Sequence, residues 1–221
     1  MKVLQITLVC LAAALLTGCW NHFGCGGDGV NGSGVELTET RDLTPFSALE
    51  FSGAFNVTAT CGGEQSFVLT GDDNIVPLVI TELRGTTLHV YTEGKTSSKI
   101  PLSVVLSCEN LEDVTGSGVL NLDLSGVDNR RLAIGVNGAG GVNAKGKTGT
   151  LKVCISGTGS ISVNDLIAED VSVTINGAGS ADVHSSRNLQ VEINGTGSVR
   201  YSGEPENVSQ KVSGMGTVTK N

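Results

Sequence analysis

The chain has 221 residues, 39% of them hydrophobic, which is enough for one continuous core. Its formal net charge is −8, and 31 residues are glycine. An acidic chain without a basic run is a poor match for nucleic acid, whose phosphates are bound by cationic side chains, so nucleic acid is excluded as a partner.

Residues 1–19 are typical of an export signal. Lys2 precedes an apolar run from Val3 to Leu16, which is shorter than the roughly 20 residues that a membrane span needs. Residues 16–19 (LTGC) resemble the bacterial lipobox, and this resemblance implies that Cys19 is lipidated and anchors the mature protein to a membrane. Trp20 follows where an aspartate would imply retention at the inner membrane, so we expect the outer membrane. An ordinary secretory signal is the alternative.

Residues 20–34 read WNHFGCGGDGVNGSG, a glycine-rich stretch with almost no apolar periodicity. We predict a flexible tether between the anchor and the folded part.

Residues 35–112 hold alternating apolar segments without a strict repeat, for example 49–61 and 100–108. We expect them to form irregular coils at the start of one elongated domain over 35–221; a separate N-terminal β-domain is the alternative. Cys61 and Cys108 continue the inward-facing positions of these two segments. They are therefore either stacked core thiols or a disulfide, which an exported compartment permits.

From residue 113 to residue 219 the chain repeats a Gly-x-Gly phrase set between aliphatic residues. The copies begin at Gly116, Gly138, Gly157, Gly177, Gly195 and Gly214, so their separations are 22, 19, 20, 18 and 19 residues. A period of this length is typical of stacked repeats, in which each unit buries its apolar face against its neighbours.

Aliphatic residues keep fixed offsets from the first glycine of each copy. Two residues before it stand Val114, Val136, Ile155, Ile175, Ile193 and Val212, and four residues after it stand Leu120, Val142, Ile161, Ala181, Val199 and Val218. These offsets share one parity, so a strand of period two points them all into one interior. The pattern predicts an all-β fold, a β-solenoid with coils of about 19 residues that turn at the glycines.

A polar residue precedes the first glycine of each copy. These residues are Thr115, Asn137, Ser156, Asn176, Asn194 and Ser213. A column of small polar side chains at a corner can hydrogen-bond along the stack, which accounts for them without any catalysis.

Two of the repeats, residues 173–180 (VTINGAGS) and 191–198 (VEINGTGS), together with residues 53–57 and 71–74, resemble a known family. The chain is similar over about residues 38–219 to the bacterial putative auto-transporter adhesin, head GIN domain family. The resemblance implies a right-handed parallel β-helix, often found on exported or lipid-anchored proteins, and it brings no catalytic residues.

Small residues follow the corner glycines on the outward parity. We call Thr158, Ser160, Ser180, Thr196 and Ser198 the outer strip. Such a strip could dock a flat surface such as a glycan, ice or another solenoid; plain solvated strands are the alternative.

Parallel β-helices also carry polysaccharide lyases and hydrolases, which need clustered carboxylates or bound calcium. The adjacent pairs Asp72-Asp73 and Glu169-Asp170 would diverge in a strand, and Asp182 with His184 lacks a nucleophile. We therefore predict no catalytic residue, no metal site and no cofactor.

The sequence predicts an exported, lipid-anchored, non-enzymatic adhesin or surface-interaction protein that binds a glycan or protein partner. A carbohydrate-active β-helix enzyme and a structural envelope protein are the alternatives. Because open solenoid ends expose strand edges, we also expect self-association through the ends.

Overall fold

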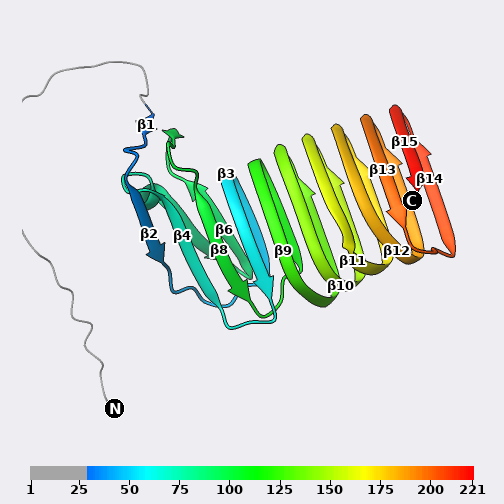
Figure 1. The fold of residues 1–221 in the computed structure, drawn as a ribbon, viewed down its shortest axis with the longest axis horizontal. Helices are drawn as coiled ribbons and strands as arrows, with labels where there is room; N and C mark the ends of the chain where they lie inside the picture. The colour runs from blue at the N-terminus through cyan, green and yellow to red at the C-terminus, as the bar shows by residue number, and fades with distance from the viewer. Residues whose placement is uncertain (1–28) are drawn as a thin grey trace, which may run out of the picture.

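The computed structural model describes residues 29–221, so the predicted signal, Cys19 and the first part of the predicted tether lie outside the described residues. The strands are β1 (Val30–Asn31), β2 (Glu36–Thr40), β3 (Ala48–Cys61), β4 (Ser66–Asp72), β5 (Val79–Arg84), β6 (Thr87–Thr92), β7 (Thr96–Ser97), β8 (Ser103–Cys108), β9 (Asp113–Val136), β10 (Ala139–Ile155), β11 (Thr158–Ile175), β12 (Ala178–Ile193), β13 (Thr196–Ser202), β14 (Asn207–Val212) and β15 (Met215–Lys220). A short 3₁₀ helix covers Val76–Leu78. Figure 1 shows the strands stacked along one long axis.

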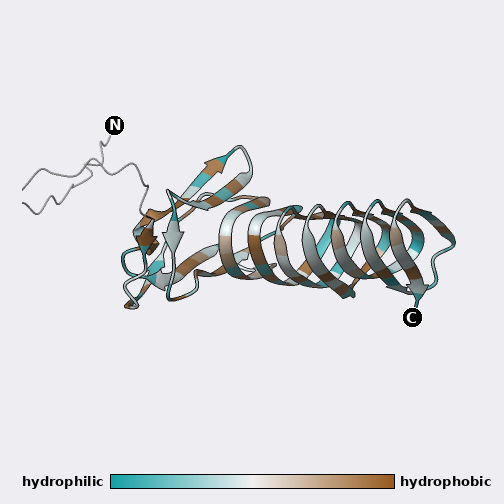
Figure 2. Cartoon of the chain, turned by 90° about the horizontal axis from the view of Figure 1, so that it is seen from above, coloured by the Kyte–Doolittle hydropathy of each residue, from teal (hydrophilic) through white to brown (hydrophobic). Residues whose placement is uncertain are grey.

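The second half of the chain is a β-solenoid of about five turns with parallel stacked coils, as the repeat predicts. Figure 2 shows its coils as successive rings. β10, β11 and β12 are each one long bent strand, broken only at the corner dipeptides such as residues 156–157 and 176–177. The ladder continues around the second bend of each coil through register shifts at residues 143–146 and 163–167.

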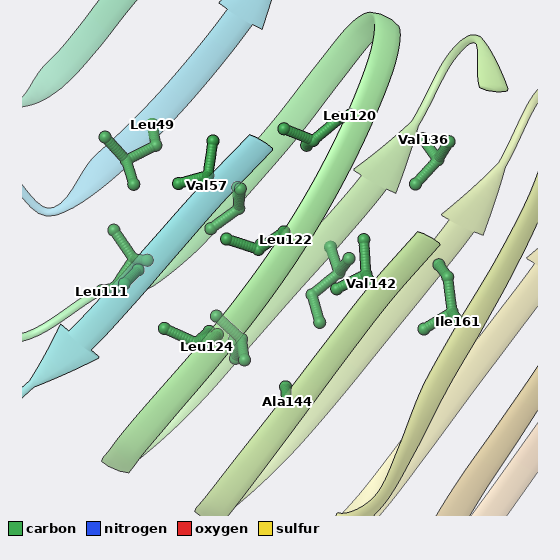
Figure 3. Packing of buried hydrophobic residues seen from close by; sticks show 14 of the residues in the cluster. Leu49, Val57, Leu111, Leu120, Leu122, Leu124, Val136, Val142, Ala144 and Ile161 are labelled. Carbon is green, nitrogen blue, oxygen red and sulfur yellow. The ribbon is translucent and has the colours of Figure 1, made fainter. Parts of the chain in front are cut away.

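The interior is a column of aliphatic side chains, and Figure 3 shows the part of it that runs from Leu49 to Ile161. Val142, Ile161 and Ala181, which share one offset in successive coils, are all at most 1% exposed. Their backbones pair in direct register, so each side chain packs on its equivalent one coil away. The parity argument for the core is thereby confirmed.

The last coil, β14 with β15, has its inward positions open. Val212 is 42% exposed, whereas Ile193, its equivalent one coil earlier, is 0% exposed. This coil therefore has apolar side chains and a strand edge at the surface, and self-association through the solenoid ends stays a prediction.

The first repeat glycine is Gly118, so the prediction of Gly116 was wrong. Ala139 pairs with Val119, which places Gly138 above Gly118, and Gly118 in turn pairs with Gly53. The polar corner residue of this copy is therefore Ser117 rather than Thr115, and Ser117 pairs in turn with Ser52.

The misplacement has a packing cause, because Gly116 occupies an inward position that an aliphatic residue fills in the other coils. A β-carbon on Gly116 would lie 2.6 Å from a terminal carbon of Leu120, whose side chain takes up that space. The spacing favours Gly118, which lies 20 residues before Gly138, but only Gly116 begins a Gly-x-Gly phrase.

Residues 35–112 form only part of a helical stack, contrary to the expectation of irregular coils throughout. β3 pairs in parallel with β9 on one side and with β6 and β8 on the other. β2, β4 and β8 pair antiparallel, as do β5 and β6. β2 to β6 and β8 belong to the same 13-stranded sheet as the coils, so the region is continuous with the solenoid. β1 and β7 form a separate two-stranded sheet.

Cys61 and Cys108 are register partners on β3 and β8, and both side chains are buried. They are stacked free thiols in the structure, and a disulfide between them stays the alternative. Cys154, which is out of phase with the core, is half-buried on the other side of its strand.

The end of the predicted tether is held against the fold, so its flexibility does not extend through residues 29–34. β1 pairs with β7, and the Gly32 N–H donates to the Ser97 carbonyl at 2.8 Å. The buried carboxylate of Asp72 accepts the N–H groups of Gly34, Lys99 and Ile100 at 2.7, 2.9 and 3.0 Å. This clamp fixes residues 32–34 to the segment that joins β7 to β8.

Candidate functional site

The outer strip lies on one outward face of the solenoid, directly after the corners. Thr158 on β11 pairs with Ala178 on β12, which pairs with Thr196 on β13. Thr158 and Thr196 are exposed. The first column of the strip is therefore continuous, with one small side chain per coil.

A second column runs beside the first, two residues further along each strand. Ser160 pairs with Ser180, and Ser180 with Ser198. The Ser180 hydroxyl donates to the Ser160 hydroxyl at 3.1 Å, a bond between neighbouring coils. The structure thus brings all five predicted strip residues together on one face.

Backbone bonds at the corners keep this face straight. The N–H of Thr158 donates to the Gly138 carbonyl at 2.8 Å, and the N–H of Thr196 donates to the Gly177 carbonyl at 2.9 Å. Each strip residue is thereby placed relative to the corner of the coil before it. A rigid surface of this kind loses little conformational entropy when it binds.

Register extends both columns toward the N-terminal end of the stack. The first continues through Ala139 and Val119, and the second through Gly141 and Asn121. None of these described positions carries a charge, so the face is uncharged as well as flat.

Charged side chains appear in a third column, which lies two residues further along each strand than the second column. Its members are Asp123, Asn143, Ser162, Asp182 and Arg200. Arg200 donates through Nε and Nη2 to the two carboxylate oxygens of Asp182, at 2.7 and 2.6 Å. Within residues 29–221 no group of three or more His, Cys, Asp or Glu side chains could hold a metal ion.

The residue pairs considered for catalysis make other contacts. Asp182 pairs with Arg200, while His184 Nδ1 lies 2.9 Å from the Ser202 hydroxyl. The two side chains thus have separate partners rather than forming a dyad.

Asp72 and Asp73 also have separate hydrogen-bond partners. Asp72 is buried in the clamp, while Asp73 is exposed and accepts the Ser33 hydroxyl at 2.5 Å. Burial alone would raise the pKa of Asp72, but the N–H groups of Ile100, Gly34 and Lys99 outweigh it, so its pKa lies below the ordinary value. An ionised carboxylate fixed by three backbone donors has a structural role.

Glu169 and Asp170 both pair with Arg187 at the second bend of the coil. The Arg187 guanidinium, helped by the side-chain amide of Asn188, lowers the pKa of Asp170 to about 2. A carboxyl with so low a pKa stays ionised at neutral pH and does not donate a proton as a general acid would.

A family model described as putative auto-transporter adhesin, head GIN domain, matches residues 45–205. The chain belongs to this family. Its description as an adhesin head fits a surface or exported protein. A comparison with curated proteins gave no match. No helix within residues 29–221 is long and apolar enough to cross a membrane.

Solved structures share the fold of this family member. A putative adhesin from Bacteroides fragilis has a TM-score of 0.67 at 20% identity, over 87% of this chain and 100% of its own. One from Parabacteroides merdae has a TM-score of 0.59 at 25% identity, over 88% and 99%. A putative lipid binding protein from Parabacteroides distasonis has a TM-score of 0.52 at 17% identity, over 88% and 100%.

Sequence reasoning missed the segment 92–102, which joins β6 to β8 around β7 and stands beside the N-terminal end of the outer face. Its residues 92–99 carry no apolar period, and only residues 100–102 belong to the alternating segment 100–108. The lone Pro101 and the polar run 92–99 mark it only as a loop. Its position beside the outer face depends on the pairing of β7 with β1 and on the hydrogen bonds to Asp72, and no local sequence pattern encodes these distant contacts.

Proposed function

We propose that this chain is an exported, lipid-anchored, non-enzymatic adhesin head that binds a glycan or protein surface through its outer strip. The observation that carries the proposal is the flat, uncharged face built from two columns of small side chains in direct register. Its backbone is fixed on every coil, so many weak contacts can form along it together.

The lipid anchor is part of the proposal and rests on the lipobox ending at Cys19. Several acyl chains, at about 0.8 kcal/mol for each buried methylene, would hold the protein on a membrane without a spanning helix. The residue after Cys19 favours the outer membrane. Substitution Cys19→Ala is expected to move the protein from the membrane fraction to the soluble fraction, and radiolabelled palmitate is expected to label only the natural chain.

The non-enzymatic part is supported by the carboxylates themselves. Asp72, Asp170 and Asp182 are each engaged by backbone donors or by an arginine. We expect no uronate release from acidic polysaccharides; measurable release that follows the protein through purification would favour the alternative, a polysaccharide lyase or hydrolase.

The adhesive face is tested by a triple variant, Thr158→Lys with Ser180→Lys and Thr196→Lys. A matched control places lysines on another outward column through Ser172→Lys, Gln190→Lys and Ser209→Lys, since these positions are also register partners on successive coils.

Binding of both variants to cells, extracellular matrix and glycans is measured beside the natural chain. The first triple variant is expected to lose binding and the second to keep it. Equal binding by all three would overturn the assignment of the strip. No binding by the natural chain to any of these surfaces would favour the structural envelope protein.

A further inference from the structure

A hollow of about 490 Å³ lies at the N-terminal end of the outer face. Its floor is the outer surface of β3 and β9, where Ala54 and Asn56 pair with Val119 and Asn121. Its wall comes from the segment 92–102, of which Thr92, Gly94, Thr96, Ser98, Pro101 and Leu102 line the hollow. The two columns of the outer face therefore run up to this hollow.

The hollow exists because one coil is interrupted. β6 pairs with residues 48–52 of β3 and β8 pairs with residues 56–61, so the two strands together replace a coil. Between them the chain leaves the stack through residues 92–102 and returns. Residues 53–55 consequently pair with β9 on one side and line the hollow on the other.

The wall is fixed in place. β7 pairs with β1, and the N–H groups of Lys99 and Ile100 donate to the buried Asp72 carboxylate. In Figure 1, β7 is the short unlabelled green strand next to β1, beside the N-terminal end of the stack. A hollow with a braced wall is formed before any ligand arrives, as is usual for small-molecule sites.

The lining has a distinct chemistry, since none of the described residues that line the hollow is charged. Its polar side chains are the hydroxyls and amides of Ser52, Asn56, Thr92, Thr96, Ser98 and Asn121. Asn121 Nδ2 donates to Asn56 Oδ1 at 2.9 Å, and each amide keeps further donor or acceptor capacity.

Apolar contact is available beside these groups. Val119 is 47% exposed on the floor, and Pro101 is exposed on the wall. A charged ligand would lose hydration here without gaining a counter-charge. A neutral sugar ring instead offers hydroxyl groups that donate and accept, and a C–H face that packs on Val119.

We propose that this hollow is a binding site for a neutral saccharide, the end of a glycan whose following units lie along the outer strip. Its volume is within the 300–1,000 Å³ or so of small-molecule sites and suits a few sugar rings. The inference rests on the proposed adhesive function, because it names the ligand class that the same face would take.

The test begins with the full chain on an array of neutral oligosaccharides (glucans, mannans and N-acetylhexosamine oligomers) and acidic ones, followed by calorimetric titration with the strongest neutral binder. The variant Ser98→Trp fills the hollow from its wall, and Ser97→Trp is its matched control, since Ser97 is an exposed neighbour that does not line the hollow. Asn121→Ala removes part of the amide pair, and Asn137→Ala, an exposed corner asparagine outside the hollow, is its control.

We expect selective binding of neutral oligosaccharides, loss of that binding in Ser98→Trp, about a tenfold weaker affinity in Asn121→Ala, and less than about a twofold change in both controls. Binding of acidic oligosaccharides equally well, or unchanged binding by Ser98→Trp, would overturn the assignment. If the natural chain adheres to cells through the strip but binds no neutral saccharide, the saccharide site is wrong and the adhesive function stands. If adhesion to cells fails as well, the proposed function is also wrong.

Discussion

Gly157 lies directly against the backbone of Gly138 one coil away, and a β-carbon placed on Gly157 would come 2.0 Å from the Gly138 carbonyl oxygen. The same relationship recurs at Gly177, Gly195 and Gly214, at 2.1 to 2.2 Å from the glycine before each. The corner glycines are thus required by close stacking of backbones. The solenoid can repeat its turn only where no side chain stands between the coils.

Gly157→Ala is therefore expected to destabilise the fold by about 2 kcal/mol or more, because the clash is with backbone and can be relieved only by moving a coil. Gly141→Ala is the matched control, since its β-carbon would find the nearest atom, a carbonyl oxygen, at 3.7 Å. Urea unfolding of both variants measures the difference. Equal midpoints for the two would show that the corner tolerates a side chain.

The core was predictable from the sequence because a strand has a side-chain period of two and the corner glycines set its phase. Ile155, Ile175 and Ile193 were assigned inward from this parity alone, and all are 0% exposed. The outer strip followed from the opposite parity. Both inferences needed only local spacing within each coil.

The N-terminal third was less predictable because its pairings are distant in sequence. Gly53 stacks on Gly118, 65 residues later, after the chain has formed antiparallel strands and the segment 92–102. Gly53 and Gly118 therefore lie in adjacent turns although about three repeat lengths of sequence separate them. The role of Asp72 was hidden for the same reason, since its three donors come from residues 34, 99 and 100.

Cys154 is expected to react with iodoacetamide in the folded protein, while Cys61 and Cys108 react only after unfolding. Cys154 is half-buried, whereas the other two are buried. The neighbouring Cys61 thiol and burial raise the pKa of Cys108, so little of its reactive thiolate is present at neutral pH. Peptide mapping by mass spectrometry identifies each site. Recovery of a peptide that links Cys61 to Cys108 from the exported protein would favour the disulfide instead.

Acid is expected to loosen the clamp around Asp72. The pKa of Asp72 in the folded protein lies below its value of about 3.9 in an unfolded chain. Its stabilising contribution is therefore complete above about pH 3.9 and is lost as the pH falls through the lower folded-state value. The protection factors of the amides of residues 97–100, which compare the intrinsic exchange rate at each pH with the measured rate, are expected to fall as the pH is lowered from 5 to 2.

Asp72→Ala should produce the same loosening at neutral pH, with exchange at residues 97–100 faster by about tenfold or more, because three N–H donors lose their acceptor. Asp128→Asn, at an exposed position on β9, is the control and should leave these amides unchanged. Unaltered exchange in Asp72→Ala would mean that the pairing of β1 with β7 holds the wall without the carboxylate.

Arg187 is expected to control the ionisation of Asp170. Its Nε donates to Asp170 Oδ1 at 2.9 Å and its Nη2 to Oδ2, while Asn188 Nδ2 donates to Oδ1 at 2.6 Å. Arg187→Gln should raise the pKa of Asp170 from about 2 toward the ordinary value near 3.9, and Asn188→Ala should raise it less, since the arginine is the larger cause.

The chemical shift of the Asp170 carboxyl carbon, recorded by NMR between pH 1.5 and pH 6, measures the pKa of Asp170 in the natural chain and in each variant. The urea unfolding midpoint at neutral pH should change little in Arg187→Gln, because an exposed ion pair is screened by solvent. If the pKa of Asp170 stayed near 2 in Arg187→Gln, the amide column from Asn188 to Asn207, linked by a bond of 2.9 Å, would be the stronger influence.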